Sequence, residues 1–240
     1  MRVNKAKAKI RAGEKAYGIA FPFKSLPLVE VVGNLGFDFI FLEAEHGFFS
    51  LPDIEEMVLM ADAKGMTTLA RVPNIHPSTV LRFLDRGVLG IMGPHIACKE
   101  DAEALVRACR FAPRGVRSFY PSKYADYVVP EDVPAYMAKA NDEVLVTALL
   151  EDESAIEDLD AILSIDGVDV SIIGHYDLSQ SMGEPGDYEH PRVAKALNEA
   201  IEKIRASKVI YGRDYLISTD IFDLVRTGAK AFLDDGAVGY

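Results

Sequence analysis

The sequence predicts a single α/β domain over residues 1–240, folded as a (β/α)8 TIM barrel. Short apolar runs alternate with longer amphipathic segments, which is the pattern of successive β–α–β units. The runs are nearly continuous in apolar residues, as in parallel strands that are covered on their outer face. A length of 240 residues suits one such barrel. The alternative is an open doubly wound sheet, which usually has a glycine-rich turn after its first strand, and AFPFKSLP has no glycine.

Eight runs have the composition of strands, and seven segments between them have helical periodicity. The strands are expected at Ala16–Phe21, Phe37–Leu42, Thr67–Arg71, Gly90–Gly93, Val144–Leu150, Asp169–Ile173, Val209–Tyr211 and Ala229–Leu233. The helices are expected at Leu26–Leu35, Leu51–Lys64, Pro77–Asp85, Lys99–Arg110, Ala155–Ser164, Pro191–Ser207 and Asp220–Thr227. A long loop over 111–141 contains a short helix near its end. Because the last strand lies close to Tyr240, the domain is expected to lack a full C-terminal helix.

Composition argues against several classes of function. Asp and Glu total 37 against 26 Lys and Arg, a net charge of −11 that would repel nucleic-acid phosphates. No apolar run reaches the roughly 18–20 residues that span a bilayer, and the basic N-terminus MRVNKAKAKIRAGEK reads as an amphipathic helix rather than a secretory signal. Cys98 and Cys109 are too far apart on one helix, roughly 16 Å, to form a disulfide. We therefore expect a cytoplasmic protein without nucleic-acid or membrane partners.

Charged and imidazole side chains recur directly after the predicted strands. Because barrel active sites lie at the C-terminal ends of the strands, these side chains are expected to meet in one site. They are Glu43, Glu45 and His46 after the second strand, Arg71 at the end of the third, His95 after the fourth, Glu151 after the fifth, and His175, Tyr176 and Asp177 after the sixth.

Several of these residues also have a purely structural interpretation. One of Glu43 and Glu45 is expected to be a solvated loop acid, and Asp177 could cap a helix. Carboxylates from neighbouring strands, without cysteine, suit a hard cation such as Mg²⁺ or Mn²⁺. A nearby arginine suits an oxyanion, and a histidine can move a proton. Together they indicate metal-assisted chemistry at a 2-oxo acid. A Schiff-base mechanism is disfavoured, because only Lys24 lies near a strand's C-terminal end.

Several motifs in the same order identify a family. They are GFDFIFLEAEHG, TLARVP, FLDRGVLGIMGPHI, RFAPRGVRS, LLEDESAIEDLDAILSIDGVDVSIIGHYDLSQSMG and HPRVAKAL. Over about Gly18 to Asp234, the sequence resembles the HpcH/HpaI aldolases, metal-dependent class II pyruvate aldolases of the phosphoenolpyruvate/pyruvate barrel superfamily. The resemblance implies a carbon–carbon lyase that reversibly cleaves a 4-hydroxy-2-oxo acid to pyruvate, or a related 2-oxo acid, and an aldehyde. It also implies a homo-oligomer, a hexamer or a trimer.

The resemblance also implies roles for individual residues. Glu151 and Asp177 would hold the divalent metal, which is Mg²⁺ or Mn²⁺ with Co²⁺ as a further option. Arg71 would bond the keto oxygen, and His46, oriented by Glu43, would be the general base on the C4 hydroxyl. Two further residues complete the set: Tyr176, which with Arg71 and Asp177 would contact the substrate, and Asp85, which would reach a site across a subunit contact. The substrate carboxylate would lie at the start of the DLSQS helix.

The sequence departs from the family pattern at three places. Glu43 stands where the family usually has Asp, His175 stands where it has Pro, and the chain ends soon after the last predicted strand. Two alternatives to the aldolase stay open. One is an acyl-CoA lyase of the citrate-lyase type, which needs a basic nucleotide-binding surface such as Arg114, Arg117 and Lys123 could supply. The other is a catalytically inactive barrel with a binding role.

Overall fold

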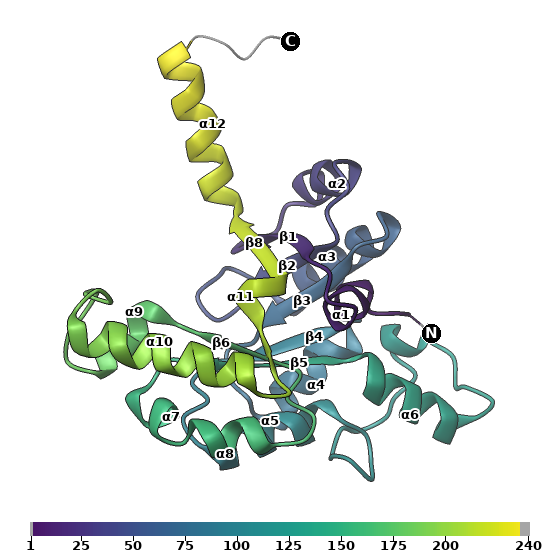
Figure 1. Cartoon of the computed structure of the whole chain (residues 1–240). Helices are drawn as coiled ribbons and strands as arrows, with labels where there is room; N and C mark the ends of the chain where they lie inside the picture. The colour runs from purple at the N-terminus through teal and green to yellow at the C-terminus, as the bar shows by residue number, and fades with distance from the viewer. Residues whose placement is uncertain (1, 236–240) are drawn as a thin grey trace.

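The computed structural model describes residues 2–235 and confirms the barrel-like α/β fold (Figure 1). Eight parallel strands form one curled sheet in the order β7-β6-β5-β4-β3-β2-β1-β8. Within the described residues β7 and β8 are not paired, so the barrel is open along that seam. The strands are β1 (Ala16–Phe21), β2 (Phe39–Glu43), β3 (Thr67–Arg71), β4 (Gly90–Gly93), β5 (Leu145–Leu150), β6 (Val170–Ile173), β7 (Ile210–Tyr211) and β8 (Leu216–Asp220).

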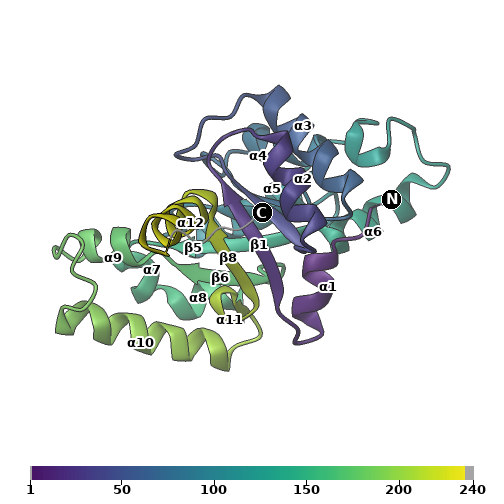
Figure 2. The same cartoon turned by 90° about the horizontal axis from the view of Figure 1, so that it is seen from above.

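Helices connect the strands and cover the outside of the sheet (Figure 2). They are α1 (Lys5–Arg11), α2 (Leu26–Asn34), α3 (Leu51–Ala63), α4 (Pro77–Asp85), α5 (Lys99–Cys109), the 3-10 turn η1 (Lys123–Ala125), α6 (Val133–Glu143), α7 (Glu153–Glu157), α8 (Leu159–Ser164), α9 (His175–Ser181), α10 (Pro191–Ala206), α11 (Gly212–Tyr215) and α12 (Ile221–Asp235). The segment expected as one helix over Ala155–Ser164 is thus two short helices. Cys98 and Cys109 are both free, as predicted.

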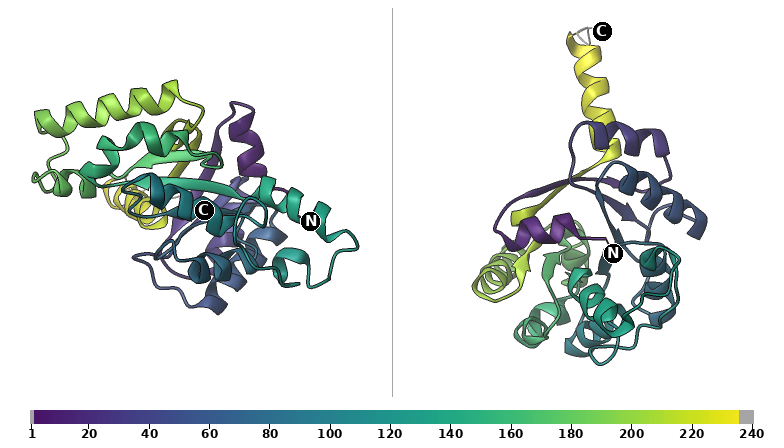
Figure 3. Two further views of the ribbon diagram at one scale, coloured as in Figure 1. Left: turned by 90° about the horizontal axis from the view of Figure 1, so that it is seen from below. Right: turned by 90° about the vertical axis from the view of Figure 1, so that its right-hand side faces the viewer.

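Two apolar clusters hold the fold together. The larger lies between the strands and the outer helices and includes the fully buried Ile19, Ile40 and Ile91. The smaller fills one end of the barrel interior with Phe39 and Leu145, among others, and is covered by α1 (Figure 3). All six residues of β5 are buried, which explains why its sequence is continuously apolar.

Ion pairs close the same end of the barrel. The buried Lys7 Nζ lies 2.9 Å from Asp169 Oδ2 and donates to the carbonyl oxygen of Val144. Arg110, whose side chain is also buried, donates to the same carboxylate oxygen over 3.3 Å. Burial lowers the pKa of Lys7 to about 8. The negative charge of Asp169 opposes this shift, and the positive charge of Arg110 adds to it. These contacts fasten α1 across the N-terminal ends of the strands.

The C-terminal segment differs from the prediction. The expected strand over Ala229–Leu233 is wrong, because these residues belong to α12, which also contains nearly all of the helix expected over Asp220–Thr227. The eighth strand is instead Leu216–Asp220, which pairs with β1 over five positions. It occupies the edge of β1 that does not pair with β2. The five apolar-rich residues AKAFL alone do not separate a strand from part of a helix.

Helix α12 follows β8 and projects from the barrel (Figure 1). The chain therefore has a C-terminal helix of 15 residues, where the sequence was expected to lack a full one. Phe222, Val225 and Leu233 are among its large exposed apolar residues, at 48%, 58% and 80% exposure. None of the helices within residues 2–235 combines the length and the apolar character needed to cross a membrane.

Candidate active site

A cavity of about 640 Å³ opens at the C-terminal ends of the strands and extends into the barrel. Six of the residues predicted for the site line it together: Glu43, His46, Arg71, Glu151, Tyr176 and Asp177. Apolar side chains of the strands, such as Phe41, Leu149 and Ile172, form its floor. The topology thus converts positions far apart in the sequence into one polar-rimmed cavity.

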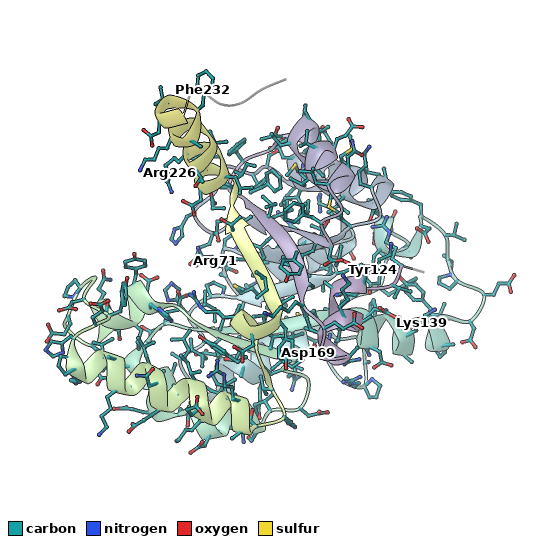
Figure 4. The ribbon with its side chains drawn as sticks, turned by 45° about the horizontal axis from the view of Figure 1, so that its top comes forward. Arg71, Tyr124, Lys139, Asp169, Arg226 and Phe232 are labelled. Atoms are coloured by element: carbon teal, nitrogen blue, oxygen red, sulfur yellow. The ribbon has the colours of Figure 1, made fainter. Side chains whose placement is uncertain are left out.

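Arg71 and Glu43 form the closest ion pair of the site. They occupy paired register positions at the ends of β3 and β2, and Arg71 Nε lies 2.6 Å from Glu43 Oε2. Figure 4 shows Arg71 among the strands at the centre of the barrel. The other oxygen of Glu43 accepts the backbone N–H groups of Glu45 and His46, both over 3.1 Å. Glu43 therefore orients the His46 segment through its backbone.

His46 lies at the rim of the cavity, with 70% of its side chain exposed. Its Nε2 is 3.9 Å from Glu45 Oε2, which is too long for a hydrogen bond. The imidazole is therefore accessible to a substrate in the cavity.

Glu45 is not the solvated acid expected for one of the pair, because Glu45 and Glu43 both contact Arg71. Only 12% of the Glu45 side chain is exposed, and its Oε2 lies 3.2 Å from Arg71 Nε. The other oxygen, Oε1, lies 3.4 Å from His95 Nε2. His95 has a left-handed φ of 50°, and its backbone N–H donates to Glu151 Oε1 over 3.1 Å. Glu45 and His95 thus link Arg71 to Glu151, although the sequence analysis placed both after strand ends without giving either of them a role.

Glu151 is the most buried acid of the site, with 1% of its side chain exposed. Burial raises the pKa of Glu151, and the negative charge of Asp177 raises it further. The backbone N–H and ring of His95 and the charge of Arg71 oppose this shift. Glu153, one of the two acids that competed with Glu151 in the sequence, pairs with Arg192 at the surface instead. A cation beside Glu151 would stabilise its ionised form.

The residues after β6 form the opposite wall of the cavity. Asp177 lies inside α9, whose N-cap is Gly174, so the capping interpretation of Asp177 is wrong. Tyr176 is exposed and packs edge-on against Tyr188, with ring centroids 5.6 Å apart. Burial, together with the charge of Arg213, lowers the pKa of His175.

Asp85 is not among the described residues that line this cavity. It ends α4, and its carboxylate lies 3.5 Å from Arg117 Nη2. Arg117 in turn is stacked between the rings of Phe111 and Tyr124, 4.4 Å from each centroid. Burial raises the pKa of Asp85, and the positive charge of Arg117 opposes this shift.

The three cations named for the acyl-CoA alternative do not form a basic surface. Only 2% of the Arg117 side chain and 5% of that of Lys123 are exposed, and Lys123 is paired with Asp62 over 3.0 Å. Arg114 is paired with Asp142 over 3.0 Å. These cations have intramolecular partners, so they do not form a surface for a nucleotide.

The two predicted metal ligands fit a hard cation that keeps most of its water. Residues 2–235 contain no ready-made cluster of three or more His, Cys, Asp or Glu side chains. Mg²⁺, however, is commonly held by one or two carboxylates together with the substrate. Glu151 Oε1 is fixed by His95, while Gly174 leaves open the space beside Oε2, since a Cβ there would lie 2.9 Å from that oxygen. Asp177 lines the same cavity.

Comparison with known proteins shows which family the chain belongs to. The sequence profile of the HpcH/HpaI aldolase/citrate lyase family matches residues 17–237. The chain belongs to this family. A 4-hydroxy-2-oxovalerate aldolase from Rhodococcus jostii is 28% identical to it over 240 residues, which cover 98% of this chain and 88% of the relative. A 4-hydroxy-4-methyl-2-oxoglutarate aldolase from Chaetomium globosum is 34% identical over 208 residues, covering 85% and 76%.

Solved structures of the HpcH/HpaI family share the fold. An HpcH/HpaI aldolase from Desulfitobacterium hafniense superimposes with a TM-score of 0.88 at 25% identity, covering 97% of this chain and 96% of that one. Family membership and aldolase relatives confirm the prediction of a carbon–carbon lyase of the aldolase type.

Gly174 provides a test of the carboxylate geometry. In Gly174→Ala the new methyl group would displace Glu151 Oε2, whereas the backbone φ of −82° suits alanine. We expect the protein to fold and its affinity for Mn²⁺ to fall by about 10-fold, as for other substitutions beside metal ligands. Calorimetric titration measures both variants, with Gly228→Ala as the control, because a Cβ at Gly228 meets nothing within 4 Å. Unchanged affinity in Gly174→Ala would contradict the assignment of Glu151.

Proposed function

We propose that this HpcH/HpaI family member is a divalent-metal-dependent class II aldolase that cleaves a 4-hydroxy-2-oxo acid to pyruvate, or a close relative, and an aldehyde. The observation that supports it best is the position of Arg71, whose guanidinium lines the same cavity as the carboxylates of Glu151 and Asp177. Acids to hold a cation and an arginine for an oxyanion are the groups that enolate formation requires.

Glu151 and Asp177 would hold Mg²⁺ or Mn²⁺, with Co²⁺ as a further option. The metal, when bound, supplies Lewis-acid polarisation of the keto oxygen. Burial raises the pKa of Glu151, and a cation held there would oppose this shift. The backbone N–H of His95 holds Glu151 in place for this role. Tyr176 is exposed at the rim, where it would contact the bound substrate together with Asp177.

Arg71 would stabilise the oxygen that becomes negative on cleavage. Its Nε is occupied by Glu43, which fixes the plane of the guanidinium. Neither Nη group has a hydrogen-bond partner among residues 2–235, so both are available to donate to the keto oxygen. As cleavage proceeds, this oxygen gains charge and the hydrogen bond strengthens. The contribution therefore appears mainly in the transition state.

His46 would accept the proton from the C4 hydroxyl group. Its imidazole is exposed at the rim of the cavity, and its backbone is held by Glu43. Removal of this proton lets the C3–C4 bond break, so that the aldehyde leaves and the enolate of pyruvate remains. In the reverse direction His46 returns the proton to the new hydroxyl group.

The homo-oligomer, a hexamer or a trimer, is part of the same proposal. The exposed apolar side chains of α12 would be buried against a neighbouring subunit, since large exposed apolar patches commonly mark protein interfaces. Asp85, which lies outside the cavity of its own chain, would contribute to a site across such a contact. The cytoplasmic location stays a prediction from the two free cysteines.

A catalytically inactive barrel is the second candidate. Its support from the sequence was His175 and the expected absence of a full C-terminal helix. Because α12 follows β8 and the polar residues of the site converge on one cavity, these features favour an active enzyme.

The metal proposal predicts that Glu151→Ala abolishes both activity and tight Mn²⁺ binding, because one carboxylate does not hold a hard cation well against water. Activity is measured as pyruvate release from a 4-hydroxy-2-oxo acid, and binding by calorimetry. Asp166→Ala is the control, since this acid is exposed and distant from the cavity. Full activity of the wild-type protein in excess EDTA would exclude the metal, and trapping by borohydride with pyruvate would restore the Schiff-base alternative.

The role of His46 predicts a separation of two reactions. Cleavage of a 4-hydroxy-2-oxo acid needs both proton removal and enolate stabilisation, whereas decarboxylation of oxaloacetate needs only the second. General-base catalysis contributes about 10²–10⁴-fold, so His46→Ala should slow aldol cleavage by that factor and largely spare decarboxylation. Arg71→Ala should depress both. The measurement is the ratio of the two rates with saturating Mn²⁺, and an equal loss of both in His46→Ala would assign His46 a positioning role.

A further inference from the structure

A second cavity lies at the N-terminal ends of the strands, at the opposite end of the barrel from the proposed active site. It has a volume of about 220 Å³, and Leu145 and Ile210, the first residues of β5 and β7, line it. Its charged lining consists of five cations and three acids: Lys7, Arg11, Arg110, Arg114 and Lys208 against Asp142, Asp166 and Asp169. A chain with a net charge of −11 thus has a local excess of two positive charges here.

Three of the five cations share one carboxylate. Lys7 and Arg11 lie four residues apart on α1, so their side chains leave the same face of the helix. Both reach Asp169, which lies beside α1 (Figure 4), over 2.9 and 3.2 Å. Arg110 reaches the same carboxylate over 3.3 Å. Because one negative charge does not neutralise three positive ones, the excess positive charge lies at these three side chains.

The two buried cations have hydrogen-bond donors that the protein leaves unused. Only 3% of the Lys7 side chain and 1% of that of Arg110 are exposed. Lys7 Nζ donates to the carbonyl oxygen of Val144 and to Asp169, and its third hydrogen has no acceptor within residues 2–235. The Nε atom of Arg110 is buried and has no partner in the described chain either. Buried donors without acceptors are costly, and an anion that accepts from them lowers that cost.

The other two cations lie near the surface. Arg114 is paired with Asp142 over 3.0 Å, whereas Lys208 Nζ lies 4.0 Å from Asp166, too far for a hydrogen bond. The Lys208 side chain is 58% exposed, and that of Arg11 is 57% exposed. A ligand can therefore reach the cavity from solvent past two mobile, positively charged side chains.

We propose that this cavity binds a phosphate dianion, either inorganic phosphate or the phosphoryl group of a small organic ester. Two negative charges match the local excess of positive charge, and phosphate oxygens accept strong hydrogen bonds from ammonium and guanidinium groups. The cavity is smaller than the roughly 300–1,000 Å³ of sites for drug-sized ligands, so the ligand is small. The inference does not depend on the proposed aldolase function, because the two cavities have no charged residue in common.

Calorimetric titration of the full-length protein at constant ionic strength measures its affinity for inorganic phosphate. We expect a Kd on the order of 1 mM or below. Acetate, which carries only one charge, should bind at least about 10-fold more weakly, because it forms fewer charged hydrogen bonds. Phosphate should also raise the Tm, since a ligand that binds only the folded state stabilises it by mass action.

Variants at the surface of the cavity test where the phosphate binds. Arg11→Gln combined with Lys208→Gln should weaken phosphate binding by about 10-fold or more and leave pyruvate release unchanged. Lys208→Gln alone breaks no hydrogen bond within residues 2–235 and should weaken binding by about 2- to 5-fold. The matched control, Lys195→Gln combined with Lys230→Gln, removes the same charge from exposed positions outside the cavity and should leave the Kd unchanged.

The outcomes separate this inference from binding in the active site. Absence of phosphate binding, or an equal Kd in the wild-type protein and the Arg11→Gln, Lys208→Gln variant, would overturn it. Loss of binding in Arg71→Lys, with binding retained in that double variant, would place the anion in the active site and also overturn it. Glycerol 3-phosphate identifies the source: binding as tight as that of phosphate supports an ester, and binding at least about 10-fold weaker supports the free ion. A protein that releases no pyruvate but binds phosphate in this way would overturn only the proposed function.

Discussion

The ion pair between Arg71 and Glu43 determines how the site is arranged. The parallel register of β2 and β3 places the two residues side by side at the strand ends, and the short Nε–Oε2 distance fixes the guanidinium. The same Glu43 carboxylate holds the backbone of His46, while Glu45 connects Arg71 to His95 and thus towards Glu151. A substitution in this one pair would therefore disturb Arg71, His46 and Glu151 together.

The two ends of the barrel differ in how their charges are paired. At the N-terminal ends of the strands, Lys7 and Arg110 converge on Asp169 and are buried, so these charges serve the attachment of α1. At the opposite end, Glu151 is equally buried, yet its pKa is raised and its strongest contact is a backbone N–H. A buried carboxylate that is held mainly by a backbone N–H suits a site that a metal completes.

Sequence patterns predicted β1 to β6 well, because each is a short run of largely apolar residues that favour strands. They failed at Ala229–Leu233, where five residues do not reveal whether a strand or a helix continues, and where pairing of Leu216–Asp220 with β1 decides the outcome. Positions after strand ends also indicated the residues of the cavity. The roles of Glu45 and His95 depend on side-chain direction and on one left-handed backbone conformation, which spacing along the chain does not encode.

The most direct test of the central role of Arg71 is the steady-state kinetics of Arg71→Lys on a 4-hydroxy-2-oxo acid with saturating Mn²⁺. Lysine keeps the charge but loses the planar group that Glu43 holds. If Arg71 donates to the developing enolate, kcat falls by about 10²-fold or more, as when an oxyanion donor is removed, while KM changes little. A rise in KM alone, with kcat unchanged, would make Arg71 a residue of ground-state binding and would contradict this role.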